Sequence, residues 1–204
     1  MLSELRKNVF QHMRENVALY LVALFAMLVG LTTGAFSVAT LSETQTQYMK
    51  DFLAAFLSTV KNENINVWRV LLQSFINNMQ ILILIGGLGL FMVGFPFIIV
   101  LVAVKGLLIG FTLGILTNVL GFKGFLIFIL CVLPANLILI PCFLRGSVLA
   151  LSSSVSKFKN RRNPMASSTY SPQYYKQFIA VVIATLVGVL IEGILQPLFI
   201  SIFA

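Results

Sequence analysis

Residues 124–151 read GFLIFILCVLPANLILIPCFLRGSVLAL, an apolar run that sets the class of fold. The run is long enough to cross a bilayer, because a membrane-spanning helix needs about 20 predominantly apolar residues. Pro134 and Pro141 lie inside it, and proline in a helix interior removes an amide donor and clashes with the preceding turn. We therefore expect a kinked span. Asn136 lies between the two prolines and is predicted to hydrogen-bond to a neighbouring helix.

The composition around this run is that of an integral membrane protein. Of the 204 residues, 59% are hydrophobic and 10% are charged, whereas soluble domains carry about 25% charged residues. The length predicts one integral membrane domain over residues 1–204. The net charge of +8 lies mostly between apolar runs, where it sets orientation and meets anionic lipid headgroups. Nucleic-acid binding is therefore not expected.

Five apolar runs predict an all-α, polytopic bundle of five transmembrane helices. The runs cover residues 17–40, 79–101, 104–120, 124–151 and 178–196, with an outer amphipathic loop over 41–78 and a cytoplasmic loop over 152–176. A signal peptide is the competing interpretation of the first run, since Ser37, Val38 and Ala39 resemble a cleavage site. The run exceeds the usual 7–15 apolar residues of such a peptide, which favours an uncleaved anchor.

Glycines predict close helix packing. Gly106, Gly110 and Gly114 recur every four residues and share one face, and Gly30 and Gly34 form a similar pair. Small residues let helix backbones approach closely in lipid. A glycine-lined pore is the alternative.

Lysine and arginine predict the orientation. With the N-terminus inside, ten of these residues are cytoplasmic and four are outside, so the positive-inside rule places the N-terminus inside and the C-terminus outside. The ten are Arg6, Lys7, Arg14, Lys105, Arg145, Lys157, Lys159, Arg161, Arg162 and Lys176, and the four are Lys50, Lys61, Arg69 and Lys123.

The outer loop is predicted to contain an amphipathic helix and a second, short helix over residues 67–75. Apolar side chains recur at helical spacing between residues 48 and 60, with charged residues elsewhere around the helix. Both helices could lie on the membrane or cap the bundle, or they could form a docking surface for an extracytoplasmic partner. The candidate partner surface consists of Lys50, Asp51, Lys61, Trp68 and Arg69.

Residues typical of catalysis and cofactor binding are missing from the sequence. The only histidine, His12, lies in the predicted cytoplasmic leader, and there is no zinc motif, phosphate loop or aspartate pair. Cys131 and Cys142 are eleven residues apart on one predicted helix, too far for a disulfide. We expect no enzymatic activity, no metal and no cofactor.

Glu192 is the one acidic residue within a predicted span, and intramembrane carboxylates are functional candidates. We expect it in the outer half of the membrane, near Lys123 or near Asn77 and Asn78. Lys105, which we place at the inner boundary, is expected to be out of its reach. Glu192 is interpreted either as a structural group that forms a hydrogen bond or an ion pair, or as a transport carboxylate.

Several motifs together resemble the stage II sporulation protein M family. They are QSFINN (residues 73–78), KGLLIGFTLG (105–114), LPANLILIPCFL (133–144), and a final span in which Glu192 is followed by Pro197. The resemblance covers nearly the whole chain. One departure is Asn77, where the resemblance leads us to expect a histidine.

The resemblance implies a multi-pass protein of the mother-cell septal membrane, required for forespore engulfment. It would anchor or organise stage II sporulation proteins D and P, which cut peptidoglycan, and would do no chemistry itself. The alternative is a small transporter or channel-like component that uses Glu192, Asn136 and the kinked helix as a polar site. Such a site requires polar residues from several spans to meet at one depth, and the candidates are Asn136, Asn118 and Glu192. Both a single chain and a homo-oligomer are compatible with this sequence.

Overall fold

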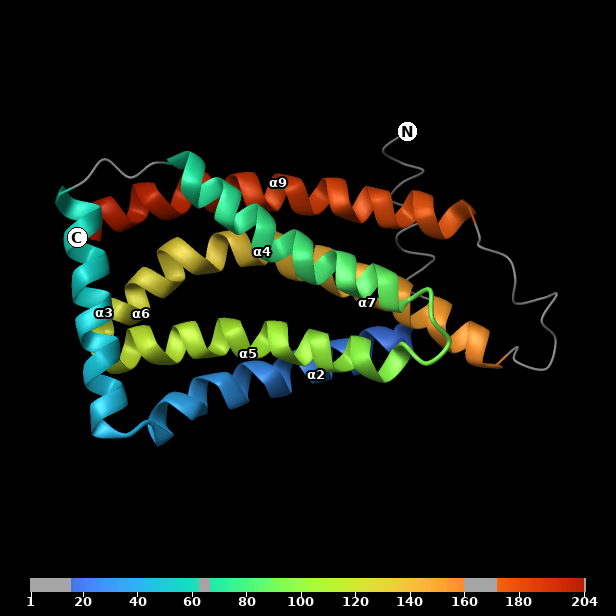
Figure 1. Ribbon diagram of the computed structural model, residues 1–204, viewed down its shortest axis with the longest axis horizontal. Helices are drawn as coiled ribbons and strands as arrows, with labels where there is room; N and C mark the ends of the chain where they lie inside the picture. The colour runs from blue at the N-terminus through green and yellow to red at the C-terminus, as the bar shows by residue number, and fades with distance from the viewer. Residues whose placement is uncertain (1–15, 63–66, 160–171, 204) are drawn as a thin grey trace.

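The computed structural model describes residues 16–62, 67–159 and 172–203, with side chains described over 16–55, 68–159 and 174–194. Every regular element in this part of the chain is a helix (Figure 1). The α-helices are α2 (Val17–Ser37), α3 (Glu43–Asn62), α4 (Val67–Leu88), α5 (Phe95–Leu120), α6 (Phe122–Ile127), α7 (Leu133–Lys159) and α9 (Pro172–Phe203). A 3-10 turn, Val38–Thr40, follows α2, and a π-helical turn, Phe128–Val132, joins α6 to α7.

Five of the helical segments are long and apolar enough to cross a membrane, which confirms the predicted fold class. They are Val17–Thr40, Trp68–Leu88, Phe95–Leu120, Phe122–Lys159 and Tyr174–Ile194. Large apolar side chains such as Phe25, Ile83 and Leu137 point outward and are more than half exposed. In a bundle of this length these side chains face lipid rather than water.

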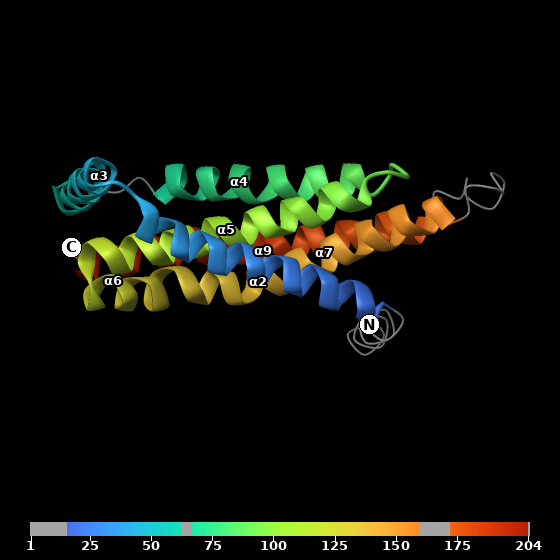
Figure 2. The same cartoon turned by 90° about the horizontal axis from the view of Figure 1, so that it is seen from below.

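The spans run roughly side by side and give the bundle two distinct ends (Figures 1 and 2). At one end α2 begins, α7 ends, α9 begins, and residues 89–94 connect α4 to α5; we call it the 89–94 end. At the other end α3 lies across the bundle, and we call it the α3 end. Helix α3 contacts both α5 and α9 there.

The turn between the second and third spans lies earlier than expected. The predicted spans, residues 79–101 and 104–120, are wrong: α4 ends at Leu88 and α5 begins at Phe95. Pro96 occupies the first turn of α5, where its missing amide has no helical partner to lose. Gly94 makes the tight connection, because a Cβ there would overlap the Leu88 carbonyl.

Side chains of α7 and α9 hold this turn in place. Ser154 Oγ donates to the Phe91 carbonyl at 2.9 Å, Lys157 Nζ donates to the Leu90 carbonyl at 2.9 Å, and the Tyr174 hydroxyl donates to the Gly86 carbonyl at 3.0 Å. They bind carbonyls of the last turn of α4 and of the connection that follows it, where the regular helical ladder has ended. The predicted loop over 152–176 is therefore too long, since α7 continues to Lys159 and α9 begins at Pro172.

Helices α2 and α5 pack through their glycines. A Cβ at Gly106 would overlap the backbone of Met27, and one at Gly110 would overlap the backbone of Leu31. Conversely, a Cβ at Gly30 would overlap the Ala103 carbonyl, and one at Gly34 the Leu107 carbonyl. The two glycine tracks therefore face each other, and close backbone contact of this kind holds helices together in lipid. Gly114 continues the track, next to Ala35 and Val38.

The fourth span bends where α6 passes into α7 (Figure 1). The π-helical turn comes immediately before Leu133 and Pro134, as expected where a proline disrupts the regular ladder. Pro141 lies farther along, inside α7. Asn136 donates to the carbonyl of Val132, the last residue of the π-helical turn in the same span, at 2.9 Å. The predicted bond from Asn136 to a neighbouring helix is therefore wrong, because the backbone next to the π-helical turn provides the acceptor.

Helix α3 begins at a capping box. Ser42 and Gln45 exchange hydrogen bonds between side chain and backbone at 3.0 and 3.4 Å, the reciprocal pattern that starts helices. The amphipathic helix expected in the outer loop is thus present. The short helix expected over residues 67–75 is not separate, because these residues form the first turns of α4.

The orientation of the bundle stays a prediction. Lys105 and Arg145 lie ten or more residues from either end of α5 and α7. Neither therefore belongs to a cytoplasmic connection, and the count becomes eight against four. The 89–94 end is still expected to be cytoplasmic.

Cysteine labelling checks this orientation. Ser156 is exposed at the 89–94 end and Gln47 is exposed on α3. In a background without Cys131 and Cys142, we expect an impermeant maleimide to label Gln47→Cys in intact cells and Ser156→Cys only after the membrane is opened. Labelling of Ser156→Cys in intact cells would invert the topology.

Candidate functional site

Two polar side chains of α4 face the interior of the bundle. Ser74 and Asn78 are one helical turn apart and therefore lie on the same side of α4, and they are only 8% and 3% exposed. Asn78 Nδ2 donates to the Ser74 carbonyl at 3.0 Å. Because buried amides require partners, this bond helps to fix the orientation of Asn78.

Glu192 of α9 and Lys105 of α5 meet at this pair. The Ser74 hydroxyl donates to the Glu192 carboxylate, and Asn78 Nδ2 donates to Glu192 Oε2 at 3.0 Å. Lys105 Nζ donates to Asn78 Oδ1 at 2.8 Å. The Asn78 amide therefore bridges an ammonium and a carboxylate from two other helices. We call Ser74, Asn78, Lys105 and Glu192 the polar cluster.

A fourth helix contacts the cluster through an aromatic ring. Lys105 Nζ lies 5.7 Å from the centroid of the Phe143 ring of α7, within the range of a cation–π interaction. The Glu192 carboxylate lies on the other side of Asn78, so one amide separates the cation from the anion. Lys105 thus has two stabilising neighbours besides Asn78, which suits a cation inside hydrocarbon.

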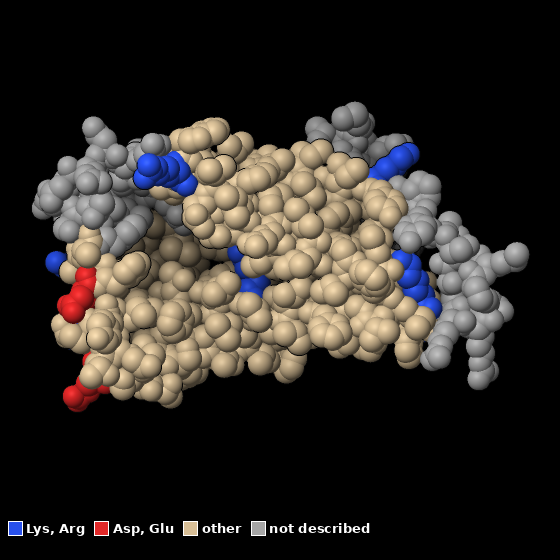
Figure 3. Space-filling view, viewed as in Figure 1, with Lys and Arg blue, Asp and Glu red and all other residues tan. Residues whose placement is uncertain are grey.

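The cluster lies deep in the membrane. Lys105 is ten residues into α5 and Asn78 is ten residues before the end of α4, so each is about 15 Å from the 89–94 end. That is half of a hydrocarbon core of about 30 Å. Figure 3 shows Lys or Arg atoms in a hollow at the middle of one face, far from the other charged atoms at the two ends.

The cluster differs from the sequence-based expectation in two ways. Asn78 is among the predicted partners of Glu192, and the structure places the two in contact. The expectation that Lys105 lies at the inner boundary and out of reach of Glu192 is wrong, because α5 begins at Phe95 and carries Lys105 into the membrane. Lys123, another predicted partner, is exposed at the start of α6.

Ser74 was not predicted as a site residue. The available signal was the spacing of Ser74 and Asn78, two polar residues four apart in a helix that is otherwise apolar on that face. Asn77 points elsewhere: it is exposed and accepts a hydrogen bond from Gln73 at 3.1 Å. The position where the resemblance leads us to expect a histidine is thus outside the cluster.

The other predicted polar positions lie apart from these contacts. Asn136 bonds within its own span, and Asn118 is exposed two residues before the end of α5. Polar groups from three spans do meet at one depth, but of the three predicted residues only Glu192 is among them. Chemically, the cluster can tie α4, α5 and α9 together, or it can hold a proton or cation at the carboxylate. No group of three His, Cys, Asp or Glu side chains that could hold a metal occurs among the described residues.

The candidate partner surface lies at the α3 end. Lys50 and Asp51 are exposed on α3, and Trp68 and Arg69 are exposed in the first turn of α4. Tyr48 and Phe52 of α3 are 73% and 68% exposed. The side chain of Lys61 lies outside the described side chains.

Comparison with known proteins identifies the family. The family model described as stage II sporulation protein M matches residues 22–197, a range that includes all five spans in whole or in large part, as well as α3 and the polar cluster. No match is found among curated proteins or among solved structures. The family match and the five apolar helices indicate a multi-pass membrane protein associated with sporulation. The chain therefore belongs to the stage II sporulation protein M family.

Proposed function

We propose that this chain is a membrane scaffold for forespore engulfment. It recruits or organises the peptidoglycan hydrolases known as stage II sporulation proteins D and P at the mother-cell septal membrane, and it performs no chemistry itself. Family membership supports a role in sporulation. The observation that carries the scaffold role is α3, a helix that crosses one end of the bundle (Figure 1) and exposes Tyr48, Lys50, Asp51 and Phe52.

The exposed surface of α3 has the chemistry of a docking site. Tyr48 and Phe52 project from the helix one turn apart, with Lys50 and Asp51 between them. Large aromatic side chains are enriched where proteins bind partners, and the rim around them is polar. Because α3 also contacts α5 and α9, a partner bound to it is held at a fixed place relative to the membrane.

A transport role is the second candidate, and the polar cluster favours it. Glu192 and Lys105 lie at mid-membrane depth on different helices and share Asn78. Intramembrane carboxylates mark ion and proton pathways in many transporters. The two proposals differ at Glu192: a transport carboxylate loses its function when its charge is removed, whereas a structural hydrogen-bond acceptor is largely replaced by glutamine.

Recovery of the hydrolases with variants of α3 tests the scaffold role. We expect the combined substitutions Lys50→Ala, Asp51→Ala and Phe52→Ala to reduce the recovery of proteins D and P with the tagged chain roughly tenfold, as removal of interface hot spots does. Thermal stability should change little, because these side chains are exposed.

The matched control combines Ser156→Ala and Lys176→Ala, which are exposed at the opposite end. This control should leave hydrolase recovery unchanged, and Glu192→Gln should too. Full recovery of the hydrolases with the α3 variant, together with loss of engulfment in a stably folded Glu192→Gln protein, would contradict the scaffold role and favour the transport role.

A further inference from the structure

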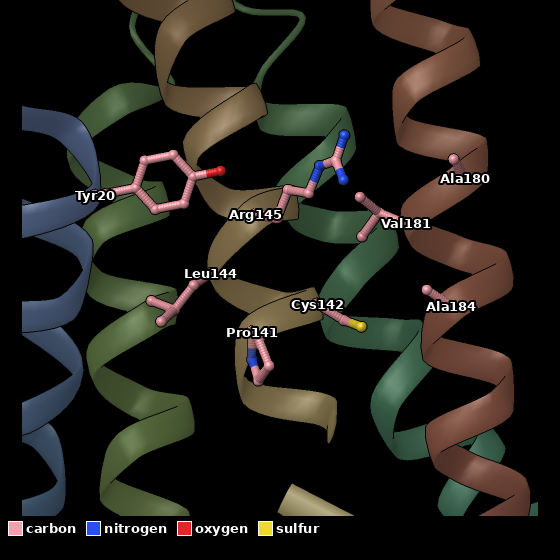
Figure 4. Close-up of a pocket in the computed structure, with 8 residues that line it drawn as sticks. All are labelled: Tyr20, Pro141, Cys142, Leu144, Arg145, Ala180, Val181 and Ala184. Carbon is pink, nitrogen blue, oxygen red and sulfur yellow. The ribbon is translucent and has the colours of Figure 1, made fainter. Parts of the chain in front are cut away.

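A cavity of about 370 Å³ lies between α2, α7 and α9, away from the polar cluster. Figure 4 shows α7 with α2 on one side and α9 on the other, and the lining side chains come from all three helices. Tyr20 comes from α2, Pro141, Leu144 and Arg145 from α7, and Ala180 and Ala184 from α9. A volume above about 300 Å³ is sufficient for a small ligand.

Arg145 is the one charged residue among those that line this cavity. Its Nε atom is buried and has no hydrogen-bond partner among the described residues. A buried donor without an acceptor is unfavourable, and more so when it belongs to a charged group. The other residues that line the cavity include no acidic side chain. The cavity therefore offers a site for an anion.

The cavity lies toward the 89–94 end. Tyr20 is the fourth residue of α2, about 5 Å from the start of that helix. Its hydroxyl points toward α7 (Figure 4). Arg145 lies two residues beyond Phe143 in α7, about 3 Å nearer the 89–94 end than the ring that contacts the polar cluster. Its side chain extends away from Pro141, toward that end (Figure 4), as long basic side chains do near an interface. The rest of the lining is largely apolar and comes from Pro141, Leu144, Ala180 and Ala184.

We propose that this cavity binds an anionic phospholipid. The guanidinium of Arg145 donates to the phosphate, as the planar donor array of arginine is suited to do. An acyl chain lies along the apolar wall formed by Leu144, Ala180 and Ala184. Basic pockets between transmembrane helices at the cytoplasmic side are a known mode of anionic lipid recognition.

Lipid titrations of the purified full-length chain in neutral detergent test this proposal. Phosphatidylglycerol should raise the melting temperature and give a bound lipid in native mass spectrometry. Phosphatidylcholine with the same acyl chains should bind more weakly, and inorganic phosphate alone should have no effect. If inorganic phosphate raised the melting temperature as much as phosphatidylglycerol does, the ligand would be a free anion rather than a lipid, and the proposal would be wrong.

Variants assign the binding to the cavity. Arg145→Gln should weaken phosphatidylglycerol binding roughly tenfold or more, since it removes a charge-assisted hydrogen bond. Lys176→Gln, an exposed cation on α9, should leave it unchanged. Ala184→Trp keeps Arg145 but fills the cavity, and it should also weaken binding; it decides the question if Arg145→Gln does not fold. Wild-type affinity in folded Arg145→Gln or in Ala184→Trp would contradict the proposal.

Discussion

Replacing Gly110 with leucine is expected to lower the free energy of unfolding by about 3 kcal/mol. Gly110 lies at the centre of the contact between α5 and α2, where even a Cβ atom would overlap the Leu31 backbone. A leucine must therefore push α2 away and lose the close contact that holds the two helices together in lipid. Unfolding in detergent with increasing dodecyl sulfate measures the loss.

Alanine at two glycines provides the matched comparison. A Cβ at Gly110 meets backbone, whereas a Cβ at Gly87 of α4 meets nothing within 4 Å. Gly110→Ala should therefore destabilise the bundle, while Gly87→Ala should be neutral or slightly stabilising because alanine favours helix. Equal stability of the two alanine variants would show that the glycine track does not hold α2 against α5.

Replacing Glu192 with leucine is expected to cost about 2 kcal/mol of stability. The substitution removes the acceptor for the Ser74 hydroxyl and for Asn78 Nδ2, and it leaves the charge of Lys105 without its anion. A polar group that stays buried after it loses its partner destabilises the folded protein, because the cost of removing it from water is no longer offset by a hydrogen bond. Glu192→Gln keeps an acceptor oxygen and should retain most of the stability.

A double substitution separates the charge pair from the rest of the cluster. Adding Lys105→Met to Glu192→Leu removes the cation left without its anion, so the double variant should be more stable than Glu192→Leu alone. The same dodecyl sulfate titration measures the difference. The single variant Lys105→Met completes the comparison. If the stability lost in the double variant equals the sum of the losses in Lys105→Met and Glu192→Leu, the two residues are not energetically coupled and the cluster is not one unit.

The number of spans could be predicted from the sequence, but their boundaries could not. Each apolar run is long, and length with composition is enough to count membrane helices. Residues 79–104 are apolar on every side, so no periodicity marks the turn within them. Pro96 lies in the first turn of α5 rather than inside the predicted span of residues 79–101. Gly94, whose missing side chain permits close approach to Leu88, was the better signal.

The misplaced start of the third span also led to the wrong prediction for Lys105. Glu192 stands out as a lone acidic residue in a span, and Asn78 was among its predicted partners. Lys105 was placed at the membrane boundary because α5 was expected to begin at residue 104. Moving the helix start to Phe95 carries Lys105 about 15 Å into the membrane, where it reaches Asn78. Contacts between spans depend on relative depth, which apolar composition alone does not fix.

Asn136 shows a different limit. A polar side chain in hydrocarbon needs a partner, and its position between two prolines suggested a central contact with another helix. The backbone around the π-helical turn provides the carbonyl of Val132 instead. A local acceptor of this kind depends on backbone geometry that the sequence pattern does not specify.

Photo-crosslinking from α3 in sporulating cells tests the scaffold role most directly. A photoreactive amino acid at Phe52, which is 68% exposed at the α3 end, is compared with one at Ile183, which is 58% exposed on the lipid-facing side of α9. The scaffold account predicts adducts with stage II sporulation protein D or P from position 52 and none from position 183. Adducts with lipid alone from position 52, in cells that complete engulfment, would contradict it.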